Sequence, residues 1–498
     1  MNLRIKFTWI INILLVFLLL ISVIGSISSI YNQIQVIPAV LILALTICFI
    51  VFGIIFSFFP KLLLSITNFI KNRRKPIFIV LVIGTLCWQV LLVMGLSGNT
   101  GWDPSMITAV AAHRSIAWYP DYFSNYPNNF FLLLLERIIN NLLRLVGINS
   151  YSLFIVVLAT ISYLLIDLSI FILFLSLKKL FNLRVAIISG VLTWGLVGIS
   201  PIVVIPYSDI PGLLISSLFL FVYTCKETRG RVIGLGLLSG VAFLVKPSLV
   251  IFDIALVIHK AFSVSKVNKA VKTVLIFTLA FLVVYIPFNL YESHNSILKI
   301  DSSKAMPANH FIAMGMTGLG GFNGKDVLAS RKIKSPQARK AYNNRLIKRR
   351  LKNFGVAGYT KFLVLKQVNN TSDAGFGWGM DAGPGYLMPF GEKTKLQNIT
   401  RRLYLRKGTS SVDINWNGYK IINQIIWTIV LIAMIYAILR FKDNYLILKL
   451  TILGGLSFLL LFEGGRSRYL IQFLPYIFAL ASLGINKWIS NSNKIKIQ

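Results

Sequence analysis

Long runs of apolar residues, separated by shorter polar segments, dominate the sequence. A helix needs about 20 mostly apolar residues to cross the hydrocarbon core of a bilayer. Candidate runs, three of them short and broken by proline or glycine, lie at residues 8–25, 36–58, 77–96, 151–177, 185–204, 210–224, 232–246, 248–262, 273–290, 421–439, 445–462 and 469–486. The pattern predicts an all-α polytopic membrane protein with about 12 transmembrane helices.

Two segments between these runs are too long and polar to be simple turns. The first contains NFFLLLLERIINNLLRLVGI and the second contains SPQARKAYNNRLIKRRLKNFG, and both patterns are typical of amphipathic helices on a surface. We therefore expect five parts, namely three spans in 1–96, a loop with surface helices in 97–150, six spans in 151–290, a small basic domain in 291–420, and three spans with a tail in 421–498.

The composition agrees with a membrane protein. The chain is 56% hydrophobic and 13% charged, with a mean hydropathy of +0.74, whereas soluble proteins carry about 25% charged residues. There are 51 Lys and Arg against 16 Asp and Glu, a net charge of +35. In a soluble chain this excess would suggest nucleic acid, but here it indicates loops that face anionic lipid headgroups rather than a nucleic-acid partner.

The distribution of the cations predicts the orientation. With the N-terminus in the cytoplasm, the cytoplasmic ends of the spans carry 23 Lys and Arg, and the short loops on the other side carry six. This asymmetry follows the positive-inside rule. We therefore expect both termini in the cytoplasm and the segments 97–150 and 291–420 outside it.

The sequence gives no sign of a metal or cofactor site. Its three cysteines, Cys48, Cys87 and Cys225, form no CxxC pair, and its four histidines show no H-x-x-x-H spacing. These are the spacings that structural and catalytic zinc sites use. We expect the chain to act without a metal or cofactor.

The acidic residues point to a site on the outer side. On the predicted topology 12 of the 16 lie outside, and only Asp167 and Asp253 fall within spans. A channel or proton-coupled carrier would place ionisable groups deep in the membrane instead. The first outer loop begins with Gly101-Trp102-Asp103-Pro104, where Asp103 is either a general base or the cap of a helix.

Further candidate residues follow in the outer loops. Asp121, Tyr126 and Asn128 lie in YPDYFSNYPNNFF, where Asp, Asn and Pro are also ordinary turn residues. Asp209 either orients a substrate hydroxyl or caps the next helix. Lys246 suits a phosphate but is also explained by snorkelling to the interface.

The last loop before the final span carries EGGRSRY. Its two arginines, Arg466 and Arg468, suit a phosphate, because a guanidinium donates two parallel hydrogen bonds. The alternative is that Glu463 pairs with an arginine to close a turn.

These motifs, in this order, resemble the GT-C superfamily of membrane glycosyltransferases. The closer resemblance is to the family 39 type, which includes protein mannosyltransferases and bacterial aminoarabinose transferases. It rests on Asp103 in the first outer loop, on PYSDIPGLL and LVKPSLVI, and on the terminal segment from Glu463 to Pro475. Where that family has an acidic pair, this chain has Asp103-Pro104, and two additional spans precede the loop.

The resemblance implies an inverting transfer of a sugar from a polyprenyl-phosphate donor to a glycan, a lipid or a protein. Asp103 would be the base, Arg466 and Arg468 would bind the donor phosphate with help from Lys246, and Asp121 and Asp209 would orient substrate. A transporter of polyprenol-linked glycans is the alternative function, and a membrane scaffold without catalysis is a third.

Overall fold

The computed structural model describes residues 3–34, 73–262, 267–377, 387–391, 394–404, 418–442 and 444–495. Within them the α-helices are α1 (Leu3–Ile34), α4 (Arg74–Leu96), α5 (Trp102–Ala111), α6 (Tyr122–Asn125), α7 (Phe130–Leu145), α8 (Tyr151–Leu180), α9 (Leu183–Thr193), α10 (Asp209–Tyr223), α11 (Arg229–Val245), α12 (Ile251–Ala261), α13 (Val267–His294), α14 (Ala308–Met314), α15 (Gly324–Lys332), α16 (Pro336–Thr371), α17 (Lys395–Tyr404), α18 (Gly418–Arg440), α19 (Leu446–Leu461) and α20 (Leu474–Ile495). Two short strands, β1 (Gly98–Thr100) and β2 (Leu387–Pro389), pair antiparallel.

The predicted all-α polytopic fold is confirmed. Six helices of the described residues are long and apolar enough to cross a membrane, namely Arg4–Ile30, Lys75–Leu96, Tyr151–Leu180, Ala270–His294, Lys420–Arg440 and Ser467–Asn491, and three shorter apolar helices lie at Leu183–Gly198, Asp209–Tyr223 and Leu446–Leu461. The predicted span 36–58 lies outside the described residues. The remaining predicted spans all coincide with helical segments.

Two of the predicted spans begin as 3-10 helix rather than α-helix. Pro247–Val250 precedes α12, and Ser467–Phe473 precedes α20. Proline at the first position of Pro247–Val250 is tolerated because a helix start needs no backbone donor there. These tighter turns bring polar side chains to the ends of the spans, where the candidate residues lie.

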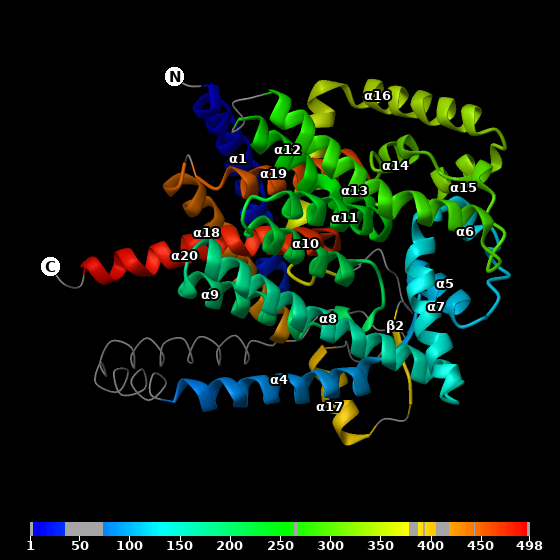
Figure 1. Ribbon diagram of the computed structural model, residues 1–498, viewed down its shortest axis with the longest axis horizontal. Coiled ribbons are helices and arrows are strands. Elements are labelled where there is room, and N and C mark those ends of the chain that lie inside the picture. The colour runs from blue at the N-terminus through cyan, green and yellow to red at the C-terminus, as the bar shows by residue number, and fades with distance from the viewer. Residues whose placement is uncertain are drawn as a thin grey trace.

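The apolar helices pack side by side in the middle of the molecule (Figure 1). Helices α11 and α13 approach each other closely, since a Cβ added to Gly236 would lie 2.5 Å from the Phe277 carbonyl oxygen. Gly240, one turn later, faces α13 in the same way. Small residues four apart let the two backbones approach closely, as they do in membrane helix pairs.

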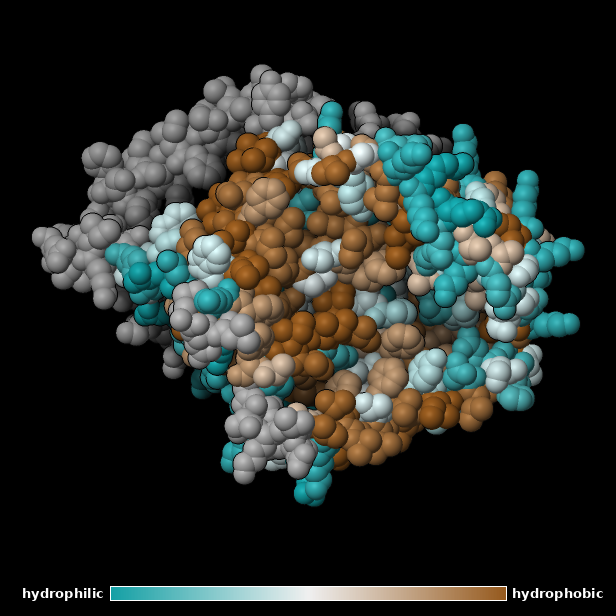
Figure 2. Space-filling model, turned by 90° about the horizontal axis from the view of Figure 1, so that it is seen from above, coloured by the Kyte–Doolittle hydropathy of each residue, from teal (hydrophilic) through white to brown (hydrophobic). Residues whose placement is uncertain are grey.

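Hydrophilic and hydrophobic side chains occupy different parts of the surface. Figure 2 shows hydrophobic residues over the middle of the molecule and hydrophilic ones gathered at the end that carries α6, α14 and α15 in Figure 1. Exposed apolar side chains such as Phe78 and Val283 belong to α4 and α13. This distribution is the one expected of helices that face lipid.

The two long loop segments pack against each other at the hydrophilic end. Met306 donates its backbone N–H to the Asn125 carbonyl at 3.0 Å, and Asp301 donates its N–H to the Ser124 hydroxyl at 2.9 Å. The predicted surface helices are present as α7 and as the first part of α16, which breaks at Gly355 with φ 60°. The two segments are therefore joined to each other at this end of the molecule.

The predicted orientation can be tested at residues that the fold exposes. In a background without native cysteines, Gln337→Cys on α16 should react with an impermeant thiol reagent added to intact cells, because the segment 291–420 is predicted to lie outside. Lys226→Cys, at the opposite ends of the spans, should react only after the membrane is permeabilised. The reverse pattern of labelling would contradict the orientation.

Candidate active site

Asp103 lies in the first turn of α5, where the chain leaves the membrane after α4. The strand pair β1–β2 fixes the chain just before it, and Gly98 is required there because a Cβ would lie 2.0 Å from the Met388 carbonyl oxygen. The N-cap of α5 is Gly101, and Asp103 is an acidic residue of the first turn. Tyr122 donates its hydroxyl to Oδ1 of Asp103 at 2.7 Å, and Tyr207 donates its hydroxyl to Oδ2 at 3.2 Å.

The two tyrosines that donate to this carboxylate come from segments that lie far apart in the sequence. Tyr122 is buried and Tyr207 is partly buried, and this burial together with the charge of Asp103 raises the pKa of both tyrosines well above the ordinary value. The phenols therefore stay protonated and act as donors. Asn129 donates to the Tyr122 hydroxyl at 2.6 Å, which fixes the direction of the Tyr122 proton toward Asp103.

A group of charged side chains lies on the Tyr207 side of Asp103. Lys246 follows α11 and places its Nζ 2.7 Å from Oδ1 of Asp209, the first residue of α10. Arg468, which is 2% exposed, places NH1 3.6 Å from Oδ2 of the same carboxylate. The Arg468 guanidinium also lies over the ring of Tyr207, 5.1 Å from its centroid. Arg468 and the carboxylate of Asp103 thus contact one shared tyrosine.

Glu463 and Arg466 complete this group. Tyr469 donates its hydroxyl to Oε1 of Glu463 at 3.0 Å, and the same ring lies 4.7 Å from the Arg468 guanidinium. Burial raises the pKa of Glu463, and the charge of Arg466 opposes that rise. The turn between α19 and the last span therefore carries two buried arginines. Its carboxylate, Glu463, is hydrogen-bonded to Tyr469.

Most of the residues predicted from the sequence come together in this region. Asp103, Asp209, Lys246 and Arg468 form a connected set, and Glu463 and Arg466 adjoin it through Tyr469. Tyr126 packs on Tyr122, with ring centroids 5.4 Å apart. Asn128 lies further out and donates to Oδ1 of Asn129 at 3.3 Å.

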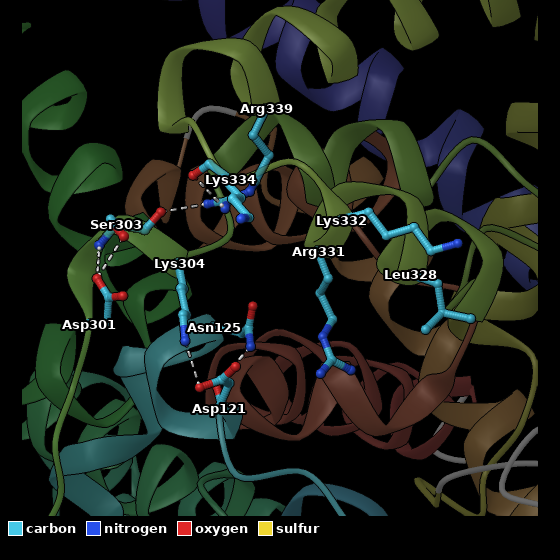
Figure 3. A pocket seen from close by; sticks show the side chains of 10 residues that line it. All are labelled: Asp121, Asn125, Asp301, Ser303, Lys304, Leu328, Arg331, Lys332, Lys334 and Arg339. Atoms are coloured by element: carbon cyan, nitrogen blue, oxygen red, sulfur yellow. Dashed lines mark hydrogen bonds and ion pairs between the residues drawn. The ribbon is translucent and has the colours of Figure 1, made fainter.

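Asp121 lies apart from these residues. Its carboxylate accepts a hydrogen bond from Lys304 at 2.9 Å and lines a neighbouring cavity, into which Lys304 and Arg331 point (Figure 3). It is next to Tyr122 in sequence, but its side chain contacts Lys304, whereas Tyr122 contacts Asp103. The structure therefore separates Asp121 from the Asp103 carboxylate.

The sequence interpretation missed four polar side chains that hold the charged groups. They are Tyr122, Asn129, Tyr207 and Tyr469, and each lies within a motif already singled out for its charge. A signal was available, because buried carboxylates and guanidinium groups need hydrogen-bond partners, which neighbouring tyrosines supply. Among the described residues, no group of three His, Cys, Asp or Glu side chains is placed to hold a metal ion.

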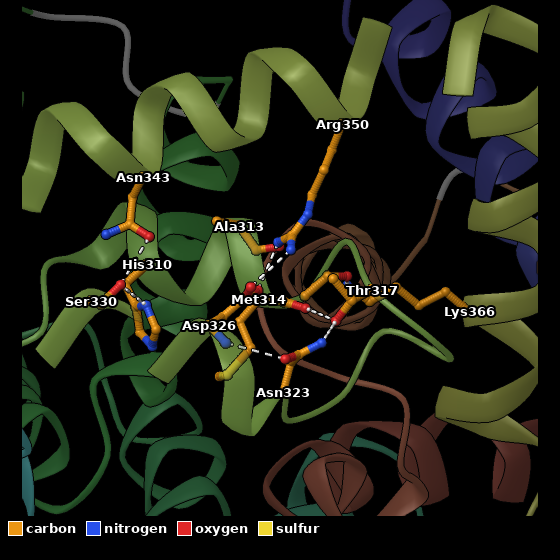
Figure 4. A network of polar contacts seen from close by, with 11 residues as sticks. His310, Ala313, Met314, Thr317, Asn323, Asp326, Ser330, Asn343, Arg350 and Lys366 are labelled. Carbon is orange, nitrogen blue, oxygen red and sulfur yellow. Dashed lines mark hydrogen bonds and ion pairs between the residues drawn. The ribbon is translucent and has the colours of Figure 1, made fainter. Parts of the chain in front are cut away.

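A polar network between α14, α15 and α16 adjoins the site (Figure 4). Arg350 binds both oxygens of Asp326, at 2.7 and 2.8 Å, and the Ala313 carbonyl at 2.6 Å. Nearby, His310 contacts the Ser330 hydroxyl at 3.0 Å, on the side where α15 meets α16. The network joins α14, α15 and α16, and so fixes the position of Gly315 at the end of α14.

Lys366 links this network to the Glu463 turn. Its side chain is fully buried, and its Nζ donates to the carbonyl oxygens of Gly315 and of Phe462, each at 2.6 Å. Gly464 next donates its N–H to the Gly320 carbonyl at 2.8 Å. The turn that carries Glu463 and Arg466 is thus held by α16.

Comparison with known proteins identifies the family. A family model described as "Conserved hypothetical integral membrane protein" matches residues 3–489. The chain belongs to this family. Its description agrees with the apolar helices, so the protein is a multi-pass membrane protein. Among the curated proteins no match is found.

Two solved structures are similar to this chain. Archaeal oligosaccharyltransferase AglB from Archaeoglobus fulgidus, in complex with an inhibitory peptide and a dolichol-phosphate, is 14% identical with a TM-score of 0.43, over 83% of this chain and 51% of that one. The chain thus spans about half the length of AglB. ArnT from Cupriavidus metallidurans in the apo state is 12% identical with a TM-score of 0.34, over 82% of this chain and 77% of that one.

Lys366 should make the stability of the protein depend on pH. Burial lowers the pKa of Lys366 to about 8 from the ordinary 10.5, although Glu463 opposes the shift. Between these two values the unfolded chain binds more protons than the folded one, so the stability of the protein rises with pH from about 8 to 10.5, and this gain is lost as the pH falls from 10.5 to about 8.

The test compares thermal unfolding of the purified protein in detergent across this range. Lys366→Met should unfold at a lower temperature and lose this part of the pH dependence. Lys361→Met, which replaces an exposed lysine on the same helix, should keep the wild-type profile. Identical profiles for Lys366→Met and the wild type would contradict the assigned role.

Proposed function

We propose that this protein is an inverting membrane glycosyltransferase. It moves a sugar from a polyprenyl-phosphate donor to an acceptor on the extracytoplasmic side, which is a cell-envelope glycan, a lipid-linked glycan or a protein. The observation that carries the proposal is the arrangement around Tyr207, where the carboxylate Asp103 and the guanidinium of Arg468 contact one side chain. The resemblance of the surrounding motifs to the GT-C superfamily supports the same function.

The proposed reaction needs one base. Asp103 takes the proton from the acceptor hydroxyl while the oxygen of that hydroxyl forms a bond to the anomeric carbon of the sugar. The bond from this carbon to the phosphate oxygen breaks, and polyprenyl phosphate leaves with the electron pair. Because attack and departure occur on opposite faces of the anomeric carbon, the configuration inverts. A phosphate leaves without protonation, so no second carboxylic acid is required.

The cations stabilise the charge of the leaving phosphate. Arg466 and Arg468 lie where the last loop enters the final span, which is the depth expected for the headgroup of a lipid donor. Cations held in a buried site stabilise developing charge strongly, since they need no reorganisation. Asp209 holds Lys246 and Arg468 in place, so we assign it a positioning role.

Removing the proposed base should abolish transfer. Asp103→Asn keeps the shape of the side chain but cannot accept the acceptor proton, and we expect turnover to fall by about 10²–10⁴-fold, the usual contribution of a general base. Turnover is measured with purified protein and a polyprenyl-phosphate sugar. Glu227→Gln, an exposed carboxylate at the other ends of the spans, is the matched control and should keep wild-type turnover.

The same variant separates the enzyme from the transporter. An enzyme with Asp103→Asn should still bind the lipid donor and stay folded while it loses transfer. Near-normal turnover in Asp103→Asn would contradict the assignment of the base. If Asp103→Asn moved lipid-linked sugar across the membrane as fast as the wild type, and neither protein transferred the sugar, the transporter would be favoured instead.

Arg468 should act on the donor rather than the acceptor. Arg468→Lys keeps the charge but not the two parallel donors, so the KM for the donor should rise. Arg468→Ala should raise it further, because Asp209 then keeps only Lys246 as its partner. Arg184→Lys, at an exposed position distant from the site, is the control. Unchanged donor KM and turnover, with lower thermal stability alone, would show that Arg468 is structural.

A further inference from the structure

A second basic site lies on the other side of Asp103, in the outer segment. It is a cavity of about 500 Å³ between α6 and the ends of α15 and α16 (Figure 3). A volume of this size is typical of small-molecule sites and suits one or two sugar units. The cavity is separate from the group around Asp209 and Lys246.

The cavity carries more positive than negative charge. It is lined by five cations and two carboxylates, and one carboxylate, Asp121, already pairs with Lys304. The other, Asp301, accepts from the N–H and the hydroxyl of Ser303. Among the described residues, no ion pair with a carboxylate engages Arg331, Lys332 or Lys334.

The charge of Arg339 adds to this excess. Its guanidinium is 2% exposed, and its hydrogen bonds go to backbone carbonyl oxygens, including those of Ser303 and Ser330 at 2.9 and 3.1 Å. Carbonyl oxygens satisfy its donors but do not cancel its charge. The wall of the cavity therefore holds a fixed cation that favours an anionic ligand.

The cavity is connected to Asp103 by aromatic contacts. The Arg331 guanidinium lies over the ring of Tyr119, 3.9 Å from its centroid, and that ring meets Tyr122 edge-on at 5.6 Å. Tyr122 donates its hydroxyl to Oδ1 of Asp103. Each oxygen of Asp103 therefore begins a separate chain of contacts. Oδ2 is connected through Tyr207 to Arg468, and Oδ1 is connected through Tyr122 and Tyr119 to Arg331.

We propose that this cavity binds the acceptor, and that the acceptor is a saccharide bearing a phosphate group. The inference rests on the proposed function, which places the donor phosphate at Arg466 and Arg468 and so leaves the cavity to the acceptor. Arg331 and Lys334 bind the phosphate, and the sugar extends from Arg331 past Tyr119 and Tyr122 toward Asp103. Guanidinium and ammonium groups are the side chains that recognise phosphate.

Binding can be measured without donor and without turnover. Purified full-length protein in detergent is titrated with a hexose 6-phosphate, the neutral hexose, a hexuronate and inorganic phosphate. The phosphorylated hexose should bind more tightly than the other three. Arg331→Gln should weaken it by about tenfold or more, the loss expected for one charge-assisted hydrogen bond. Lys334→Gln is a second, exposed variant and should weaken it in the same direction.

The control and the contrary outcomes are distinct. Arg345→Gln, an exposed arginine on α16 outside the cavity, should bind like the wild type. Equal binding of neutral hexose, equal binding of inorganic phosphate, or equal loss in Arg345→Gln would overturn the proposal. Asp103→Asn should bind normally, so a failure of the proposed function alone leaves this measurement intact.

The role of the cavity in acceptor binding is tested by competition. In the transfer assay, the hexose 6-phosphate should compete with the acceptor and not with the polyprenyl-phosphate donor. Competition with the donor would assign the cavity to the donor phosphate and contradict the proposal.

Discussion

The arrangement of the site depends on one buried carboxylate, Asp209, that must be paired. It begins α10, and its two oxygens face Lys246 at the end of α11 and Arg468 at the start of the last span. Leaving any of these charges unpaired in a buried site costs several kcal/mol, roughly 3–5 for a broken buried pair. Three turns between spanning helices are therefore held together. Tyr207, two residues before Asp209, is placed where it meets Asp103.

The segment that contains α14 and α16 supports the same site. Lys366 donates to carbonyl oxygens on two sides, one at the end of α14 and one in the Glu463 turn. A buried lysine is costly unless its donors are satisfied, so its position is coupled to the packing of both segments. The charged groups lie on turns that are held by contacts to the surrounding helices, and such fixed positions are what preorganised catalysis requires.

Much of the fold was predictable from the sequence, because a bilayer forces apolar runs of about 20 residues into helices. The surface helices α7 and α16 were predictable from their periodicity. The pairing of β1 with β2 was not, because three-residue strands carry no pattern and lie far apart in the sequence. The break at Gly355 was also not anticipated, although glycine favours its positive φ.

The site was predictable in part because charged residues are scarce in this chain, so that Asp103, Asp209, Lys246 and Arg468 stood out. Their pairing was not predictable, because only the tertiary structure brings these residues together. Asp121 was grouped with them because it is an acidic residue of the same loop as Asp103. In the structure Asp121 directly precedes α6 and binds Lys304, whereas Tyr122, the first residue of α6, binds Asp103.

The central claim is that one carboxylate, Asp103, drives a single displacement at the anomeric carbon. The most direct measurement is the anomeric configuration of the product, determined by NMR from a purified reaction with a polyprenyl-phosphate sugar of known anomer. Our account predicts a product of opposite configuration, released together with polyprenyl phosphate. A product of retained configuration would require a second nucleophile and would contradict the account.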